Sequence, residues 1–204
     1  MMKVRVIPVA DTKNILIVGV GGQGTILASK VIAGVAMRKG MDIKVSEIHG
    51  MAQRGGSVVT QVRYGKEVFA PTISPGTADG ILAFEKLEAL RMLHYLRKGG
   101  TVIVNSQELY PLPVLTGSVQ YPSDIIERIS SRVPRTIEVN ALEIAERCGS
   151  SKVVNTVLLG VLAPLLDTDF EVWREVIKET VPFRTVDINL EAFREGVRLA
   201  QDLV

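Results

Sequence analysis

The sequence predicts an α/β fold, a three-layer α/β/α Rossmann-like domain whose sheet is largely parallel but mixed. An apolar run, Asn14 to Val18, ends in a glycine turn that leads into apolar residues at helical spacing, Thr25 to Arg38. Further along, short apolar runs alternate with helical stretches, which is typical of parallel sheets. One strand directly follows another at Ile43 to Ile48 and Ser57 to Tyr64, and this pair predicts the mixed part of the sheet.

The second half of the chain continues the alternation and then becomes helical. We expect a strand at Gly80 to Phe84, a helix at Glu85 to Arg97 that Gly99-Gly100 breaks, and a strand at Thr101 to Asn105. After an irregular stretch with prolines, the expected elements are a helix at 124–133, a strand at 136–140 and helices at 141–148, 153–166, 169–180 and 190–204. No repeat or shift in composition divides the chain, so residues 1–204 are expected to form a single domain with a helical part at 153–204.

Composition excludes several classes of function. The chain has 204 residues, 47% of them hydrophobic, and its net charge of +2 comes without a basic stripe, so we expect no nucleic-acid partner. The longest apolar run, residues 153–166, is too short for a bilayer of about 30 Å, so no membrane association is expected. The N-terminus lacks a signal-peptide pattern, which favours a cytoplasmic location. With Cys148 as the only cysteine, we expect no iron-sulfur cluster or metal site on this chain.

A glycine turn is the first candidate site. Gly19, Gly21 and Gly24 have the spacing G-x-G-x-x-G between a strand and a helix, where the free amides of the helix N-terminus can bind an anion. Gly22 belongs to the same turn, and Gln23 is expected to add a polar tip to the same crevice. The alternative is that these glycines only make a sharp turn.

The second candidate is the segment from His49 to Ser57, which combines glycines with polar side chains between two apolar strands. Glycine allows close approach to a ligand, and Arg54 offers a planar, permanently charged set of donors. We interpret the segment as a binding loop. A glycine-rich turn with a local ion pair is the alternative.

These segments are expected to meet, because ligands of open α/β sheets bind beyond the carboxyl ends of the strands. Glu85, after the Gly80 to Phe84 strand, and Asn105-Ser106, after the next one, fall at the same edge. Glu85 is equally suited to stabilise the start of its own helix through the helix dipole.

A nicotinamide-dependent oxidoreductase is the alternative enzyme class. Glu47 lies 23 residues after Gly24, near the position where a dinucleotide fold places its ribose-binding acid. However, the chain then enters another strand instead of the helix that such a fold requires. His94 falls within an expected helix and is not expected to be catalytic.

Two segments together resemble a known family. GVGGQG (residues 19–24), and SEIHGMAQRGGSVVTQVRYG (residues 46–65) about twenty residues later, are similar to the gamma-type subunits of the 2-oxoacid:ferredoxin oxidoreductases, and HGMAQRGGSV is most similar to the indolepyruvate type. The stretch DGILAFEKLEAL, residues 79–90, also resembles its counterpart in that family.

The resemblance implies a subunit of an enzyme that oxidatively decarboxylates arylpyruvates such as indolepyruvate, with CoA as co-substrate and ferredoxin as electron acceptor. It places thiamine diphosphate and the iron-sulfur clusters on a large alpha subunit, so this chain would be inactive alone. The single cysteine agrees with that division. The site carried over by resemblance consists of two crevice loops, Gly19, Gly21, Gly22, Gln23 and Gly24, and His49, Gln53, Arg54, Gly55, Gly56 and Ser57. Arg54 would pair with a CoA phosphate or with a carboxylate across the subunit interface, and a purely scaffolding role remains a further alternative.

Overall fold

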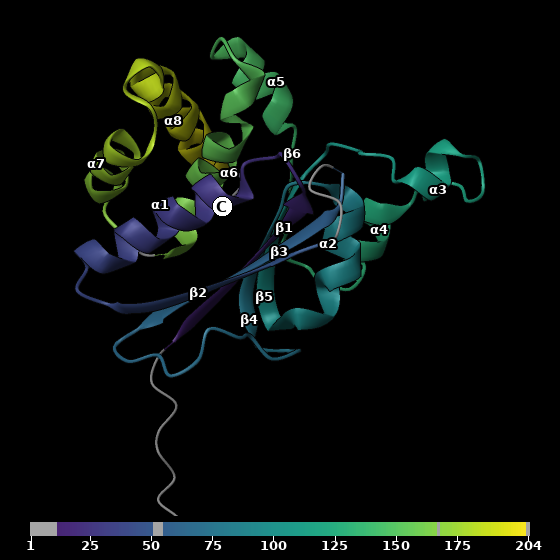
Figure 1. Ribbon diagram of the computed structural model, residues 1–204, viewed down its shortest axis with the longest axis horizontal. Helices are drawn as coiled ribbons and strands as arrows, with labels where there is room; N and C mark the ends of the chain where they lie inside the picture. The colour runs from purple at the N-terminus through teal and green to yellow at the C-terminus, as the bar shows by residue number, and fades with distance from the viewer. Residues whose placement is uncertain (1–11, 51–54, 167, 203–204) are drawn as a thin grey trace, which may run out of the picture.

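The protein is a single six-stranded sheet covered by helices on both faces (Figure 1). The computed structural model describes residues 12–50, 55–166 and 168–202. Two residues of the predicted site, Gln53 and Arg54, lie outside the described residues. Within the described ranges, no helix is both long enough and apolar enough to cross a membrane.

The strands lie in the order β2-β3-β1-β4-β5-β6. In chain order they are β1 (Lys13–Val20), β2 (Asp42–His49), β3 (Ser57–Gly65), β4 (Ala78–Ala83), β5 (Leu96–Asn105) and β6 (Thr136–Val139). The α-helices are α1 (Thr25–Arg38), α2 (Lys86–Met92), α3 (Leu112–Leu115), α4 (Ile125–Ser130), α5 (Ala141–Arg147), α6 (Val154–Leu162), α7 (Phe170–Thr180) and α8 (Val186–Asp202). Short 3-10 turns are η1 (Leu93–Tyr95), η2 (Ser151–Val153), η3 (Ala163–Leu166) and η4 (Phe183–Thr185).

Strand β3 is the reversed strand of the sheet. It pairs antiparallel with both β1 and β2, whereas β1, β4, β5 and β6 pair parallel with one another. The predicted α/β fold with a largely parallel, mixed sheet is therefore confirmed, and the segment after the His49 to Ser57 loop supplies the antiparallel strand.

Alternate residues of β1 serve the two faces of the sheet. Ile15 and Ile17 belong to the apolar core under α1 and α5 to α8, and Leu16 and Val18 to the core under α2 and α4. Since successive side chains of a strand point to opposite faces, a fully buried strand needs the unbroken apolar run seen there. Figure 1 shows these helices on the two sides of the sheet, which makes the three layers that the sequence predicts.

Helices α6 and α8 cross at close contact because glycines meet there. A Cβ atom at Gly160 would lie 2.2 Å from the Phe193 carbonyl oxygen, and one at Gly196 would lie 2.1 Å from that of Val157. Only glycine fits at either position. This contact packs α8 onto α6, which itself contacts β5.

The expected helix from Glu85 to Arg97 was wrong at its C-terminal end. Helix α2 ends at Met92, a 3-10 turn follows, and β5 already begins at Leu96. Gly99 lies inside β5 with φ of 75°, where the pairing with β4 shifts register, and Gly100 leaves room for the side chain of Leu96. The two glycines therefore allow a bulge in a strand, although in the sequence they look like a helix break.

Other boundaries differ less. Helix α1 coincides with the predicted Thr25 to Arg38, whereas α8 begins four residues before the predicted Leu190. The stretch expected to be irregular contains the short helix α3.

Candidate functional site

The two glycine-rich segments meet at the edge of the sheet where β1 ends. The Gly21 amide donates to the Gly56 carbonyl oxygen at 2.9 Å, and Val20 pairs with Ser57 in the β1–β3 ladder. The Gly50 amide donates to the Ser57 carbonyl oxygen at 3.0 Å, and this hydrogen bond joins the two ends of the second segment. The predicted meeting of these two segments is thus present in the structure.

Positive φ angles explain several of these glycines. Gly22 has φ of 101°, Gly24 of 86° and Gly55 of 77°, which side chains disfavour. Gly19 is needed for a different reason, because a Cβ atom there would lie 2.8 Å from Gln23 Oε1 and 2.9 Å from Phe84 Cβ. The turn therefore depends on both backbone conformation and close approach.

Gln23 braces the turn against the neighbouring strands. Its Oε1 accepts from the Val20 amide at 2.7 Å, and its Nε2 donates to the Phe84 carbonyl oxygen at 3.0 Å and to Gln107 Oε1 at 3.1 Å. Asn105 also donates from Nδ2 to the Phe84 carbonyl oxygen, at 3.2 Å. The side chain of Gln23, which was expected to face the crevice, is thus hydrogen-bonded to protein groups at the ends of β1, β4 and β5.

Two buried carboxylates anchor the same edge. Glu88 Oε2 accepts from the Ser57 hydroxyl at 2.5 Å, while its Oε1 lies 3.1 Å from Arg91. Glu85 is the N-cap of α2, where it accepts from the Glu88 amide at 2.9 Å and from the Tyr121 hydroxyl at 2.5 Å. Burial raises the pKa of the Glu85 carboxyl, against the opposing effect of these hydrogen bonds. In this geometry Glu85 has the helix-start role that the sequence left open.

Helix α1 begins directly after the glycine turn. Gly24 is its N-cap, no side chain caps the helix, and its first turn holds no acidic residue. Ile26 in that turn is 44% exposed. Amides at a helix start attract anions, with a dipole contribution of about 0.3–1 kcal/mol.

Asn155 contributes a further donor at this point. Its side chain is 4% exposed, and its Nδ2 lies 2.8 Å from where a Gly24 Cβ atom would be. Asn155 Oδ1 accepts from the Thr156 amide at 2.9 Å, and Nδ2 has no hydrogen-bond partner among the described residues. Nδ2 is not among the buried side-chain atoms that lack a partner, so its donors are accessible at the start of α1. Accessible amide donors next to uncapped helix amides are suited to an anionic group.

His49 lies at the exposed end of β2. Its Nε2 is 3.5 Å from Glu47 Oε2, and Glu47 Oε1 accepts from the Ser29 hydroxyl at 3.3 Å. The side chain of Glu47 is therefore directed to α1 and to His49. Together with Gly55 and Gly56, His49 frames the segment that contains Gln53 and Arg54, whose placement lies outside the described residues.

Sequence reasoning missed Glu88, Gln107, Tyr121 and Asn155. Glu88 lies three residues after the N-cap Glu85, a position with a recognised sequence pattern in helix starts, so it had a local signal. The other three come from segments far along the chain and had none. Asn155 stands in the sequence only as an interruption of an apolar run.

Known proteins match nearly the whole chain. The family described as pyruvate ferredoxin/flavodoxin oxidoreductase matches residues 14–199. The indolepyruvate oxidoreductase subunit IorB of Archaeoglobus fulgidus is 44% identical over 191 residues, which cover 92% of this chain and 94% of that protein.

The chain belongs to the pyruvate ferredoxin/flavodoxin oxidoreductase family. This confirms the family predicted from the two glycine-rich segments.

Solved structures of low sequence identity share the fold of this family member. The gamma subunit of the keto/oxoacid ferredoxin oxidoreductase from Geobacter sulfurreducens has a TM-score of 0.69 at 24% identity, over 93% of this chain and 99% of that one. The 2-oxoglutarate:ferredoxin oxidoreductase of Magnetococcus marinus, with 2-oxoglutarate, coenzyme A and succinyl-CoA bound, has a TM-score of 0.72 at 21% identity. There the match covers 95% of this chain but 32% of the other, so the same fold forms part of a longer polypeptide.

The sheet order of this family member argues against the dinucleotide alternative. A dinucleotide fold places its second strand directly beside the first, whereas here β3 lies between β1 and β2. Neighbouring strands are about 4.8 Å apart, so β2 is about 10 Å from β1. Glu47, which would have to hold the ribose, is therefore one strand too far from the glycine turn.

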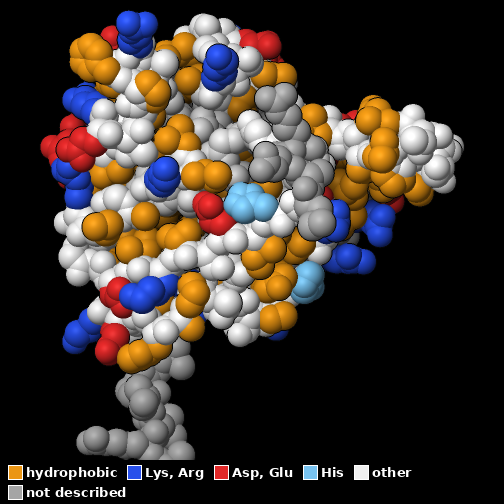
Figure 2. Space-filling model, in the orientation of Figure 1, with side chains coloured by type: hydrophobic (Ala, Val, Ile, Leu, Met, Phe, Trp, Pro, Cys, Tyr) orange, Lys and Arg blue, Asp and Glu red, His pale blue; other side chains and the backbone are white. Residues whose placement is uncertain are grey.

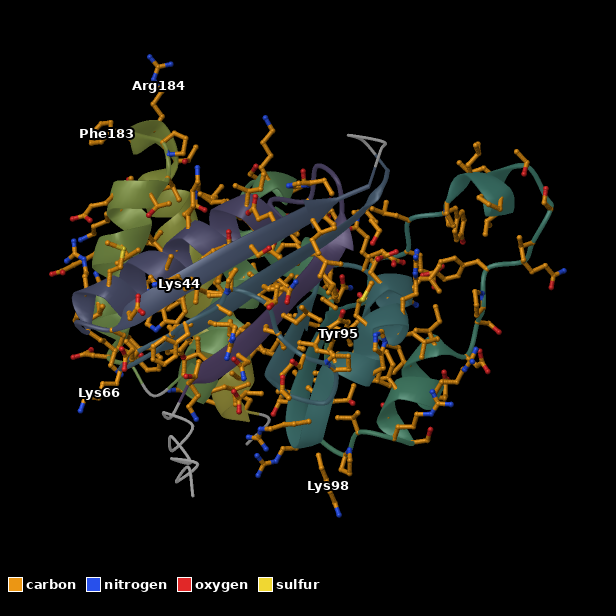
Figure 3. All side chains as sticks on the ribbon, turned by 60° about the horizontal axis from the view of Figure 1, so that its bottom comes forward. Lys44, Lys66, Tyr95, Lys98, Phe183 and Arg184 are labelled. Carbon is orange, nitrogen blue, oxygen red and sulfur yellow. The ribbon has the colours of Figure 1, made fainter. Side chains whose placement is uncertain are left out.

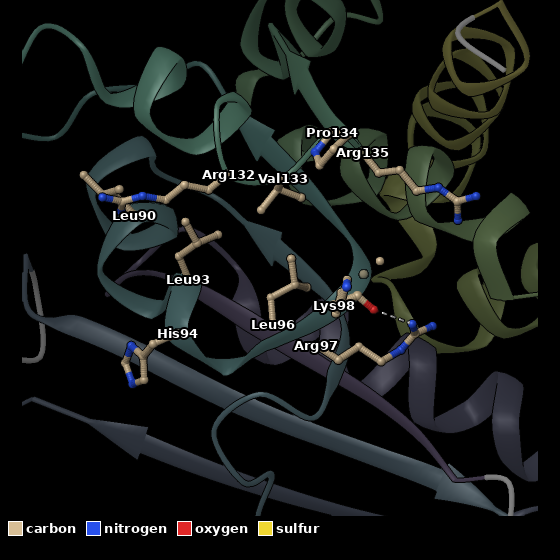
Figure 4. Close-up of a pocket in the computed structure, with 12 residues that line it drawn as sticks. Leu90, Leu93, His94, Leu96, Arg97, Lys98, Arg132, Val133, Pro134 and Arg135 are labelled. Carbon is tan, nitrogen blue, oxygen red and sulfur yellow. Dashed lines mark hydrogen bonds between the residues drawn. The ribbon is translucent and has the colours of Figure 1, made fainter.

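A cavity of about 1000 Å³ lies at the start of β5, at the end of the strands away from the glycine turn. Leu93, Leu96 and Val133 converge on it in Figure 4, at the start of β5 and before β6. Its lining residues include four cationic side chains and no carboxylate: Arg97, Lys98, Arg132 and Arg135. His94 lies on its rim, with Nδ1 3.1 Å from the Arg91 carbonyl oxygen. None of its lining residues belongs to the two glycine-rich segments.

Proposed function

We propose that this chain is the subunit without thiamine diphosphate in a 2-oxoacid:ferredoxin oxidoreductase that acts on arylpyruvates such as indolepyruvate. It would assemble with a large alpha subunit and support CoA-dependent oxidative decarboxylation, with electrons passed to ferredoxin. The names of the similar proteins support the reaction class, and the 44% identity to an indolepyruvate oxidoreductase subunit supports the substrate class.

The geometry that carries the proposal is the crevice at the start of α1. Uncapped helix amides and the unused Nδ2 donors of Asn155 meet there beside the Gly21–Gly56 contact. CoA carries phosphates, and such donors suit one of them. We propose that this crevice holds an anionic part of CoA, and that Arg54 pairs with a second anionic group of CoA or with a carboxylate of the partner subunit.

The electron-carrying cofactors are assigned to the partner. An iron-sulfur cluster requires several cysteine ligands, and the chain has Cys148 alone. In the described part of the chain, no three His, Cys, Asp or Glu side chains gather as metal ligands. We propose that the large subunit holds the clusters and, as the resemblance to the family implies, thiamine diphosphate. A free cysteine fits a reducing compartment, and we propose the cytoplasm.

Reconstitution tests the proposal. The chain is purified alone and together with its large subunit, and each sample is assayed with indolepyruvate, phenylpyruvate and pyruvate in the presence of CoA and a ferredoxin or dye acceptor. We expect activity only from the complex, dependent on CoA, with the arylpyruvates preferred. Activity from the isolated chain, or saturable NAD binding by it, would contradict the proposal.

The Arg54→Ala variant distinguishes a purely scaffolding role of the chain from a binding role of the loop that contains Arg54. If the loop meets a ligand or the partner, this substitution lowers turnover or assembly while the subunit stays folded. Wild-type turnover and assembly would make the loop purely structural.

A further inference from the structure

An arm, residues 106–122, leaves the sheet at the end of β5 and carries α3 near its tip. Figure 1 shows it projecting from the body of the molecule. Four of its large apolar side chains are exposed by more than half: Tyr110 51%, Leu112 72%, Leu115 68% and Val119 58%. Figure 2 shows hydrophobic side chains gathered on this projection. Clustered exposed apolar groups of this kind mark interaction surfaces.

The arm is also unusual in its charge. From Leu109 to Ser123 no residue is charged, although 23% of the chain is Asp, Glu, Lys or Arg. Exposed loops usually keep their solubility through charged and polar side chains. An exposed, apolar and uncharged segment instead fits an apolar, uncharged surface on another molecule.

The root of the arm is fixed to the crevice edge. The Leu109 amide lies 3.4 Å from Glu85 Oε1, which also accepts from the Tyr121 hydroxyl at 2.5 Å. The rings of Tyr110 and Tyr121 are 5.1 Å apart. Glu108 pairs with Lys86 at 2.6 Å. Both ends of the arm are therefore held at the start of α2, so the arm is preorganised beside the crevice and loses little freedom on binding.

We propose that this arm docks into an apolar, uncharged groove on the large subunit of the oxidoreductase, next to the crevice. The inference rests on the proposed function. In the Magnetococcus marinus structure the shared fold is 32% of a longer chain, so it is covalently joined to the remainder of that chain. The Archaeoglobus fulgidus relative, 94% of which this chain matches, is named a subunit, so a surface of such a protein contacts another chain. The arm is an exposed apolar element beside the crevice that can make this contact.

The test is a double variant, Leu112→Ser with Leu115→Ser, in the full-length chain. Both side chains are exposed, so the melting temperature should not change. Anchors of this kind are worth roughly tenfold each in affinity, so the dissociation constant for the purified large subunit should rise on the order of 100-fold. Added salt should change the loss of affinity caused by the double variant little, because no residue from Leu109 to Ser123 is charged.

Phe183→Ser is the matched control. Phe183 is 92% exposed on η4, and Figure 3 shows it at the opposite end of the molecule from α3. This variant should bind the large subunit like the wild type. Equal weakening by both variants would overturn the assignment to the arm, and so would a double variant that binds like the wild type or one that loses only self-association.

Failure of the docking role can be told apart from failure of the proposed function. If the wild-type chain neither binds the large subunit nor supports its activity, the proposed function fails. If the wild type does both and the double variant matches it, only the docking role of the arm fails.

Discussion

Gln23→Ala tests whether the side chain in the glycine turn is a brace. The substitution removes the hydrogen bonds to the Val20 amide, the Phe84 carbonyl oxygen and Gln107. The Phe84 oxygen keeps Asn105 as a donor, so its loss is small. The Val20 amide loses its acceptor in a residue that is 8% exposed.

The loss of stability has two parts, the Val20 amide left without an acceptor and the lost bonds to Phe84 and Gln107. An unsatisfied buried amide costs about 1–3 kcal/mol, and the two remaining bonds contribute about 0.5–1.5 kcal/mol each. Asn105 Nδ2 donates to the Phe84 carbonyl oxygen and also to Gln107 Oε1, at 3.4 Å, so both acceptors keep a donor. We therefore expect the free energy of unfolding to fall by about 2–4 kcal/mol. For a chain of this size that corresponds to a fall in melting temperature on the order of 10 °C.

Urea unfolding of the isolated chain measures this loss. Gln107→Ala is the control, because it removes a side-chain partner of Gln23 without exposing the Val20 amide, and it should cost about 1 kcal/mol or less. If Gln23→Ala were as stable as the wild type but weakened ligand binding in the complex, the brace would be refuted, and Gln23 would face a ligand.

Three further predictions concern stability. Burial raises the folded-state pKa of Glu85 above its unfolded value, so its contribution is present at low pH and is lost as pH rises through the folded pKa. Glu85→Gln should therefore flatten that part of the pH dependence of urea unfolding, and an unchanged profile would contradict the reasoning. Burial raises the pKa of Tyr64 to about 12, so stability should fall between the unfolded pKa of about 10 and the folded value. Burial also raises the pKa of Tyr121, so the late tyrosinate absorbance step of the folded protein should become smaller in Tyr64→Phe. Gly196→Ala should cost about 3 kcal/mol or more, because its Cβ atom would lie 2.1 Å from the Val157 carbonyl oxygen, and a melting temperature like that of the wild type would show that α6 and α8 separate easily.

The fold was predictable where local pattern and packing agree. The run before Gly19 is buried on both faces, and its strand, turn and helix lie as predicted. The strand after the His49 to Ser57 loop predicted the antiparallel β3. Hydrophobic periodicity did not predict the start of β5 at Leu96, because the helical pattern of apolar residues continues into this strand. The bulge in β5 depends on its pairing with β4. That pairing is a tertiary contact, which the local sequence does not specify.

The candidate site was predictable in location more than in detail. The carboxyl-edge rule brought the Gly19 to Gly24 turn and the second segment together, and the Gly21–Gly56 hydrogen bond joins them. The roles of single side chains depend on distant partners. Gln23 is held by Phe84 and Gln107, and the donor nearest Gly24 comes from Asn155 in α6.

The central claim is that this subunit supplies an anion-binding crevice to a CoA-dependent complex, and the most direct measurement is the KM for CoA of the reconstituted complex with Asn155→Asp. A carboxylate in place of the Nδ2 donors repels an anion at the start of α1. We expect assembly to be retained and the KM for CoA to rise by about tenfold or more, equivalent to at least about 1.4 kcal/mol, with a smaller rise for Asn155→Ala. An assembled Asn155→Asp complex with the wild-type KM for CoA would contradict the claim.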